Sequence, residues 1–425
     1  MSTVNDIGKL REQREQERRR RGRDAARARR ESGEAARESR WLNPVRIIKM
    51  REYDHILFVT VLCLVGFGLV MVLSASQFSA TQTEGGIFSF LIMQSIAAAA
   101  GFVALFVLAN GMGPKDGGRA FLGYRFLAKM ALPIYVIANL LLAATLVIGH
   151  EVSGGTRWIR IPGLGFQFQP SEIAKIAVIL FLAHYIAGDR KRTDTVKGLL
   201  GCAIIIGIPC ALVALGRNFS TVLIIAAIGA AMIFLASKFF WRWLGLAGAA
   251  AGGIAAYLAM SDGFRASRFA AWRDPWSDPL GYGYHAIQSL YAIASGGLFG
   301  LGIGNSNQKM RYLPEAHNDF IFAIIVEELG LFGAGLLLLF FGILVWRGCM
   351  IAIRARDLAG TLIAAGITAM ISIQVIINVG VVTGTIPNTG IPLPFISYGG
   401  TSMLVMLAAM GILLNISKFP KNKYK

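Results

Sequence analysis

The chain has 425 residues, of which 55% are hydrophobic and only 16% are charged, and its mean hydropathy is +0.57. A water-soluble domain carries roughly a quarter charged residues and does not repeat apolar runs of about 20 residues, the length that crosses a hydrocarbon core of about 30 Å. The composition therefore excludes a soluble globular protein and predicts an all-α, polytopic integral membrane protein with about ten transmembrane helices.

Positive charge is concentrated at the N-terminus. The formal net charge is +18, but 16 of the 42 Lys and Arg residues lie within residues 1–52. Residues 1–46 are rich in Arg, Glu and Ala and have almost no apolar face, which predicts a disordered or weakly helical tail. This tail is either attracted to anionic lipid headgroups or is a solvated segment that only sets the orientation of the chain. Because the basicity is local, we expect no nucleic-acid partner.

The apolar spans follow one another from residue 56 onward. In chain order they cover 56–76, 87–108, 130–149, 171–187, 198–216, 219–237, 243–260, 320–346, 358–383 and 401–416. Ten spans place both termini on the same side of the membrane. That side carries 33 Lys and Arg residues and the opposite loops carry 8. The positive-inside rule therefore predicts that both termini are cytoplasmic.

Three of the loops that face the outside in this topology stand out. The longest, residues 261–319 between the seventh and eighth spans, is rich in Trp and Tyr, which favours contact with the membrane interface or the helical bundle. The loop 150–170 contains Arg157 and Trp158 in the segment GGTRWIRI. The loop 384–400 is rich in Gly and Pro and has no charge. It can re-enter the membrane only if protein surrounds it.

Ionisable residues within the spans are few and costly, so each is a candidate for function. Glu172 and Lys175 stand three residues apart on one helix face, as a structural ion pair or as functional groups. Glu327 and Glu328 lie two turns into the eighth span. They are either functional acids or a pair of buried carboxylates that are satisfied by neighbouring helices or protonated. Gln374 and Asn378 share a face of the ninth span, which favours hydrogen bonds between helices.

Asp319 stands where the long outer loop meets the eighth span. The spacing allows two interpretations. Asp319 either caps the helix, accepting its free N–H groups, or acts as a general base reached from the aqueous phase and the headgroup layer. His317, Glu315, Lys309 and Arg311 lie close in sequence and could tune such a base or hold a phosphate. The cysteines and the scattered histidines show no metal-site or redox spacing.

Several long motifs in order resemble one family. Residues 268–329 include LPEAHNDFIFAIIVEEL, residues 387–402 read PNTGIPLPFISYGGTS, and the segments GGTRWIRI and FQPSEIAK precede them. Over residues 50–418 the chain resembles the SEDS family (shape, elongation, division and sporulation), which comprises FtsW, RodA and SpoVE. The segment YLPEAHNDFIFA resembles the FtsW and SpoVE branch more than RodA, whereas GIPLPFISYGG is also common in RodA. The resemblance favours FtsW, and with it a role in cell division. One departure is LGRNFST at 215–221, where many members have an acidic residue, so no role is transferred to that loop.

The resemblance implies an enzyme of cell-wall synthesis. The expected activity is that of an inverting peptidoglycan glycosyltransferase, which polymerises lipid II and releases undecaprenyl diphosphate at the outer face of the bacterial cytoplasmic membrane. It implies that Asp319 is the essential residue, and that residues 47–418 form the membrane domain, with a short basic tail at 419–425. The further candidates for contact with substrate are Arg157, Trp158, Lys175, Arg273, Gln288, Ser289, Lys309, Arg311, Glu315, His317 and Ser397.

The expected partners are lipid II, membrane lipids, a class B penicillin-binding protein with transpeptidase activity, and other membrane proteins of the division or elongation complex. Cationic side chains or a divalent cation, Mg²⁺ or Mn²⁺, would stabilise the departing pyrophosphate, and the sequence identifies no ligands for a metal. Two alternatives belong to other classes, namely a lipid II flippase or transporter and a noncatalytic scaffold for a transpeptidase. Sequence does not decide between roles in division, elongation and sporulation.

Overall fold

The computed structural model describes residues 53–81, 86, 88–111, 123–152, 155–160, 167–237, 269–310 and 312–420. Within these ranges, nine helices are long and apolar enough to cross a membrane. They are α2 (His55–Thr81), α3 (Ser89–Ala109), α5 (Ala131–Ile148), α6 (Pro170–Gly188), α7 (Val196–Leu215), α8 (Phe219–Ala236), α12 (Ile321–Arg354), α13 (Leu358–Val382) and α14 (Gly400–Ser417). The prediction of a polytopic helical membrane protein is confirmed.

The predicted span 243–260 and the tail 1–46 lie outside the described residues. The residues that flank this span lie at opposite ends of the bundle. Ser237 bonds to Thr193 in the connection between α6 and α7, whereas the indole of Trp272 bonds to Gly384 after α13. The predicted span 320–346 is shorter than α12, which continues to Arg354.

Shorter elements connect the long helices. They are α4 (Tyr124–Lys129), the 3-10 helices η1 (Arg190–Asp194) and η2 (Pro275–Ser277), and α11 (Tyr284–Gly296). The segment expected to be a loop at 150–170 contains a small antiparallel sheet in the order β1-β2-β3, made of β1 (His150–Val152), β2 (Gly155–Arg160) and β3 (Gln167–Phe168). Its residues, such as Thr156, Trp158 and Ile159, are β-branched or aromatic types that favour strands.

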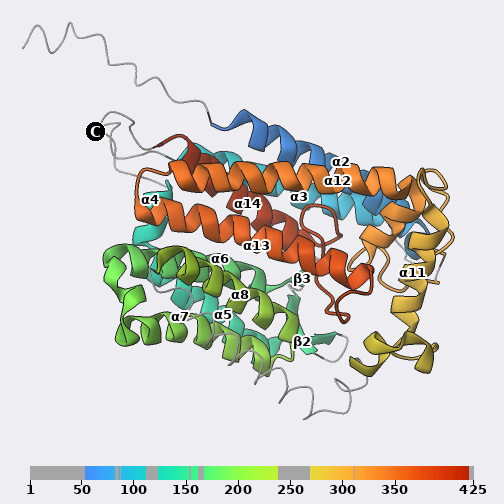
Figure 1. Cartoon of the computed structure of the whole chain (residues 1–425), viewed down its shortest axis with the longest axis horizontal. Helices are drawn as coiled ribbons and strands as arrows, with labels where there is room; N and C mark the ends of the chain where they lie inside the picture. The colour runs from blue at the N-terminus through green and yellow to red at the C-terminus, as the bar shows by residue number, and fades with distance from the viewer. Residues whose placement is uncertain are drawn as a thin grey trace, which may run out of the picture. The chain divides into compact units, whose positions relative to one another are not determined.

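Helix α13 lies at the centre of the described bundle. It packs against α6, α8, α12 and α14, and α14 in turn packs along α3 (Figure 1). Buried residues occur on every face of α13, as expected for a helix that other helices surround. Helices α5 and α7 instead bury one face only, and they carry exposed Leu, Ile and Val on the other. That pattern is typical of helices that border lipid.

Polar contacts tie the helix ends together at one end of the bundle. Asp54, just before α2, accepts hydrogen bonds from the guanidinium of Arg347 near the end of α12, with Nε at 3.0 and 3.1 Å from its two oxygens. The Asp54 backbone N–H donates to Ser417 Oγ at the end of α14. The beginning of α2 and the end of α14 therefore meet at this end. We call the opposite end, where α12 begins, the Asp319 end.

Helix α12 contains a break close to the Asp319 end. Gly330 has φ 69° and ψ −174°, a left-handed backbone that favours glycine. A Cβ atom there would collide with the carbonyl oxygen of Leu298, because the loop after α11 runs directly against the break. The N–H groups of Leu301 and Gly302 donate to the carbonyls of Glu327 and Glu328. The break thus lets the outer loop pack into α12 with its backbone groups satisfied.

Candidate active site

Asp319 lies in the turn that leads into α12, and its side chain is half-buried. Phe320, rather than Asp319, occupies the N-cap position of α12. The structure therefore does not place Asp319 at the N-cap position itself.

Three hydrogen bonds hold the backbone of the turn. The Asn378 amide donates to the Asp319 carbonyl at 2.8 Å, and the Ser397 hydroxyl donates to the Asn318 carbonyl at 2.6 Å. The N–H of Tyr398 donates to the His317 carbonyl at 3.0 Å. Helix α13 and the uncharged loop 384–399 therefore fix consecutive residues 317–319 from one side.

The carboxylate of Asp319 faces a glycine of this loop. A Cβ atom built on Gly390 would stand 3.1 Å from Asp319 Oδ2, and Gly390 has φ +64°. The preceding Thr389 is fastened to α8, because the Ser220 hydroxyl donates to its carbonyl oxygen. The loop thus approaches the carboxylate closely at a position that has no side chain.

Several buried polar atoms near Asp319 have no hydrogen-bond partner within the protein. They are His317 Nδ1, Asn318 Oδ1, Asn378 Oδ1 and Thr389 Oγ1. Each belongs to a residue beside Asp319, bonded to Asp319, or adjacent to Gly390. A buried polar atom without a partner is costly, and native proteins keep few of them. Their concentration here favours a site that receives hydroxyl or amide groups of a ligand, or water.

An aromatic cluster lies behind the turn. The ring centroids of Phe90, His317 and Tyr398 lie 4.9, 5.0 and 5.8 Å apart in pairs. Burial lowers the pKa of His317 below its ordinary value, and the nearby Glu315 carboxylate offsets part of this effect. Burial also raises the pKa of the Tyr398 hydroxyl. Both side chains are therefore neutral at pH 7.

Lys175 forms the ion pair that its spacing allowed. Its Nζ lies 2.8 Å from Glu172 Oε1 and 3.3 Å from Gln374 Oε1, and the lysine is 1% exposed. Gln374 thus links α13 to α6, which confirms its predicted role between helices. The second oxygen of Glu172 is buried without a hydrogen-bond partner.

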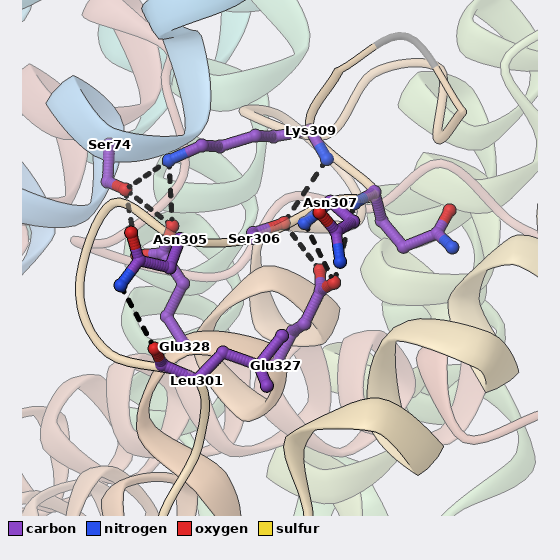
Figure 2. A network of polar contacts seen from close by, with 9 residues as sticks. Ser74, Leu301, Asn305, Ser306, Asn307, Lys309, Glu327 and Glu328 are labelled. Atoms are coloured by element: carbon purple, nitrogen blue, oxygen red, sulfur yellow. Dashed lines mark hydrogen bonds and ion pairs between the residues drawn. The ribbon is translucent and has the colours of Figure 1, made fainter.

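Lys309 is the cation of a second buried network (Figure 2). Its Nζ lies 3.0 Å from Glu328 Oε1 and 3.3 Å from Ser74 Oγ, and the lysine is 5% exposed. The Ser74 hydroxyl lies 2.7 Å from both oxygens of Glu328. This Lys309 network joins α2, α12 and the outer loop.

Glu327 is satisfied by the same stretch of loop. It accepts hydrogen bonds from the Ser306 hydroxyl and from the N–H groups of Asn307, at 3.0 Å, and Gln308, at 3.4 Å (Figure 2). Both Glu327 and Glu328 are fully buried. Both acids are buried, as expected, but the outer loop rather than a neighbouring helix satisfies Glu327, and Ser74 of α2 together with Lys309 of the loop satisfies Glu328.

The other candidates occupy different places at the Asp319 end. Arg157 and Trp158 are half-buried on β2, and the Arg157 guanidinium donates to the Arg217 carbonyl at 3.0 Å. Arg157 also lines a small polar cavity with Thr145, Thr156, Ser171 and Asn218. Arg273 is exposed. Arg311 lies outside the described residues.

Three candidates contribute mainly structural contacts. Ser289 is buried and its hydroxyl donates to the Val382 carbonyl at 2.8 Å, which fastens α11 to α13, while the adjacent Gln288 is half-buried. Glu315 is exposed and accepts from the side-chain amide of Asn318. Of all the candidates, the structure brings His317 and Ser397 directly onto the Asp319 turn.

Sequence reasoning missed two residues that support the site. Gln94 in α3 donates to the Ser397 carbonyl at 3.2 Å and accepts from the Gly399 N–H at 3.0 Å. It is an amide within a long apolar run, which could have signalled a functional or packing role. Ser220 lies in the segment LGRNFST, to which no role was transferred. Among the described residues, no group of three or more His, Cys, Asp or Glu side chains could hold a metal ion.

Comparison with known proteins identifies the family. Residues 54–422 match the profile of the FtsW/RodA/SpoVE family, described as "Cell cycle protein". The chain is 40% identical to stage V sporulation protein E of Bacillus subtilis (strain 168) over 377 residues, which cover 87% of this chain and 98% of that protein. It is 36% identical over 375 residues to the probable peptidoglycan glycosyltransferase FtsW of Geobacter sp. (strain M18), with coverage of 87% and 98%.

Solved structures agree with this assignment. A chain from a peptidoglycan synthase complex, described as coordinating polymerization and crosslinking, superposes with a TM-score of 0.69 at 28% identity and covers 86% of this chain and 97% of its own length. The rod shape determining protein RodA of Thermus thermophilus superposes with a TM-score of 0.61 at 26% identity, with coverage of 88% and 98%. The motifs, the helical bundle and these matches agree, and the chain belongs to the FtsW/RodA/SpoVE family of membrane proteins.

Proposed function

We propose that this protein is a peptidoglycan glycosyltransferase that polymerises lipid II, with Asp319 as the general base. The relatives named probable peptidoglycan glycosyltransferase FtsW and the match to a peptidoglycan synthase complex support the activity. One structural observation carries the assignment of the base. The half-buried Asp319 carboxylate is held where the outer loop enters α12, amid buried polar atoms that have no partner within the protein.

The location suits a substrate that is part sugar and part lipid. Lipid II has its disaccharide in water and its polyprenyl chain in the bilayer, so the reacting carbons lie at the level of the headgroups. Asp319 stands two residues before α12, a helix long and apolar enough to cross a membrane, and this supports a place at that boundary. A base deeper in the bundle would reach the lipid chain rather than the sugar.

The reaction is a single displacement. Asp319 takes the proton of the 4-hydroxyl of the acceptor sugar, and that oxygen attacks the anomeric carbon of the donor. A new glycosidic bond forms as the bond from the anomeric carbon to the phosphate oxygen breaks. Undecaprenyl diphosphate leaves with the electron pair, and the proton passes from Asp319 to solvent. Attack opposite an α-linked leaving group gives a β-linked product.

The leaving pyrophosphate requires positive charge, and the basic candidates differ in availability. The ammonium groups of Lys175 and Lys309 are buried in ion pairs with Glu172 and Glu328. Because Arg273 is exposed, we assign contact with the pyrophosphate to Arg273, and Arg157 stays a further candidate. We assign Lys175 and Lys309 to positioning the surrounding helices. Arg311 remains a candidate outside the described residues. No step of this mechanism is assigned to a divalent cation.

The surroundings of the enzyme follow from the same proposal. We assign residues 47–418 to the membrane domain, and the tails 1–46 and 419–425 to the cytoplasm. The Asp319 end then faces the outside, where lipid II carries its sugars. A class B penicillin-binding protein is the proposed partner, because a relative belongs to a complex described as coordinating polymerization with crosslinking.

The test compares Asp319→Asn with Asp274→Asn in the purified full-length protein, together with its partner, in lipid. Both changes are isosteric, but Asp274 is an exposed acid of the outer loop that caps η2. We expect Asp319→Asn to lose at least about 100-fold in the rate of lipid II polymerisation, within the range for removal of a general base. Asp274→Asn should keep the wild-type rate. An undiminished rate for Asp319→Asn would refute the base assignment, and lipid II translocation without polymerisation would support the flippase alternative.

A further inference from the structure

Asn378 makes an unusual pair of contacts near the end of α13. It is 1% exposed, and its Nδ2 donates to the carbonyl oxygens of Asp319 and Ile391, both at 2.8 Å. A side-chain amide has two N–H donors. Both are therefore used, one on the turn that carries the carboxylate and one on the loop that faces it.

These two carbonyls also determine which way the amide points. Only the NH₂ side can bond to two carbonyl oxygens, so Asn378 Oδ1 lies on the other side of the group. That oxygen is buried and has no hydrogen-bond partner in the protein. An asparagine that served packing alone would be costly here, because a buried acceptor without a partner lowers stability.

The two bonds span the elements that flank the carboxylate. Ile391 follows Gly390, and a Cβ atom built on Gly390 would stand 3.1 Å from Asp319 Oδ2. Asn378 therefore fixes the distance between the Asp319 main chain and the loop that faces its side chain. Ser397 holds the neighbouring Asn318 carbonyl, but it belongs to the loop itself.

We propose that Asn378 is a positioning residue for Asp319: it holds the main chain of the base at a fixed place against loop 384–399. This inference rests on the proposed function and deepens it. A structural hydrogen bond between helices would support folding regardless of what residue 319 does. A positioning residue acts through Asp319, so its removal has no effect once the base is gone.

The experiment is a double-mutant cycle of Asn378→Ala and Asp319→Asn in the full-length protein with its partner. We expect Asn378→Ala to lower kcat by about 100-fold, the cost of misplacing a reacting group by about 1 Å, and to leave KM almost unchanged. In the Asp319→Asn background, Asn378→Ala should not lower kcat any further. The control is Thr368→Ala, which removes a buried hydroxyl of α13 that bonds only within its helix, to the Ala364 carbonyl.

The outcomes separate the two proposals. The positioning role is overturned if Asn378→Ala lowers kcat by the same factor in the wild type and in Asp319→Asn. It is also overturned if Asn378→Ala alone keeps the wild-type kcat. Either result leaves the base assignment intact. A wild-type rate for Asp319→Asn overturns both. If Asp319→Asn has no measurable rate, the loss of kcat at constant KM decides, measured at a temperature at which Asn378→Ala and the wild type are both fully folded. If Asn378→Ala does not accumulate, Asn378→Ser, whose hydroxyl can donate to only one carbonyl, should show a smaller loss of kcat.

Discussion

The Oδ2 atom of Asp319 lies 3.1 Å from the place that a Cβ atom of residue 390 would occupy, and that residue is glycine. The contact joins the proposed base to a loop 71 positions further along the chain. The loop 384–399 therefore borders the site directly. The first prediction concerns this contact.

We expect Gly390→Ala to reduce polymerisation strongly, because the methyl group would press on the carboxylate and displace it. Gly384→Ala provides a matched control. Both glycines lie in the same loop with positive φ, +64° and +73°, so each substitution introduces similar backbone strain of about 1–2 kcal/mol. The nearest atom to a Cβ on Gly384 is Leu290 Cδ2, at 3.9 Å. Steady-state rates and Tm values of the two variants check this, and equal losses of activity would contradict it.

Removal of the Lys309 charge should destabilise the protein. Lys309→Met leaves Glu328 buried without its cation, a change that costs about 3–5 kcal/mol for a buried pair. Lys309→Met with Glu328→Gln removes both charges and should recover much of the loss. Thermal unfolding in one detergent measures the single and double variants. If the decrease in Tm of the double variant equals the sum of the decreases in Lys309→Met and Glu328→Gln, the two side chains do not stabilise each other.

Ser397→Ala should impair catalysis more than folding. The hydroxyl accepts from the Leu393 N–H at 2.8 Å and donates to the Asn318 carbonyl, so its loss leaves two buried groups unpaired, at a cost of about 1–3 kcal/mol each. The Asp319 turn would then shift. Ser295→Ala, which removes a hydroxyl bonded within α11, is the control. A kcat for Ser397→Ala equal to that of Ser295→Ala would argue against a role at the site.

Stability should depend on pH through His317. Burial holds its pKa below the ordinary value of 6.5, so the unfolded chain binds a proton before the folded chain does. The neutral ring therefore contributes full stability above about pH 6.5, and this contribution is lost as pH falls. We expect the Tm of the wild type to drop relative to that of His317→Phe between about pH 7.5 and 5.5. If Tm falls with pH equally in the wild type and in His317→Phe, then His317 has the same pKa in the folded and the unfolded chain.

The helices were predictable because composition alone identifies membrane spans. Apolar runs of the right length gave each of the nine spans within a few residues, apart from the end of α12. The small sheet at 150–168 was not predicted, since strands of two to six residues carry too short a pattern. The break at Gly330 was equally hidden, because one glycine in an apolar run does not reveal its backbone angles.

The site was predictable only in part. Family resemblance identified Asp319, whereas spacing alone could not decide between a helix cap and a base. Lys309 was interpreted as a candidate for a phosphate because it lies close to Asp319 in sequence. Its ion pair with Glu328 and its contact with Ser74, 235 positions away, are visible only in three dimensions. Asn378 was expected to join helices, but its contact with the Asp319 carbonyl depends on a loop whose path is fixed only in three dimensions.

The three hydrogen bonds that α13 and the loop 384–399 donate to residues 317–319 end on main-chain carbonyl oxygens. Every amino acid supplies such an oxygen, so the anchorage tolerates replacement of the side chains at 317 and 318. Evolution can therefore alter what surrounds the carboxylate without relocating it. The same scaffold could acquire a preference for differently decorated precursors by single substitutions beside an acid that stays in place.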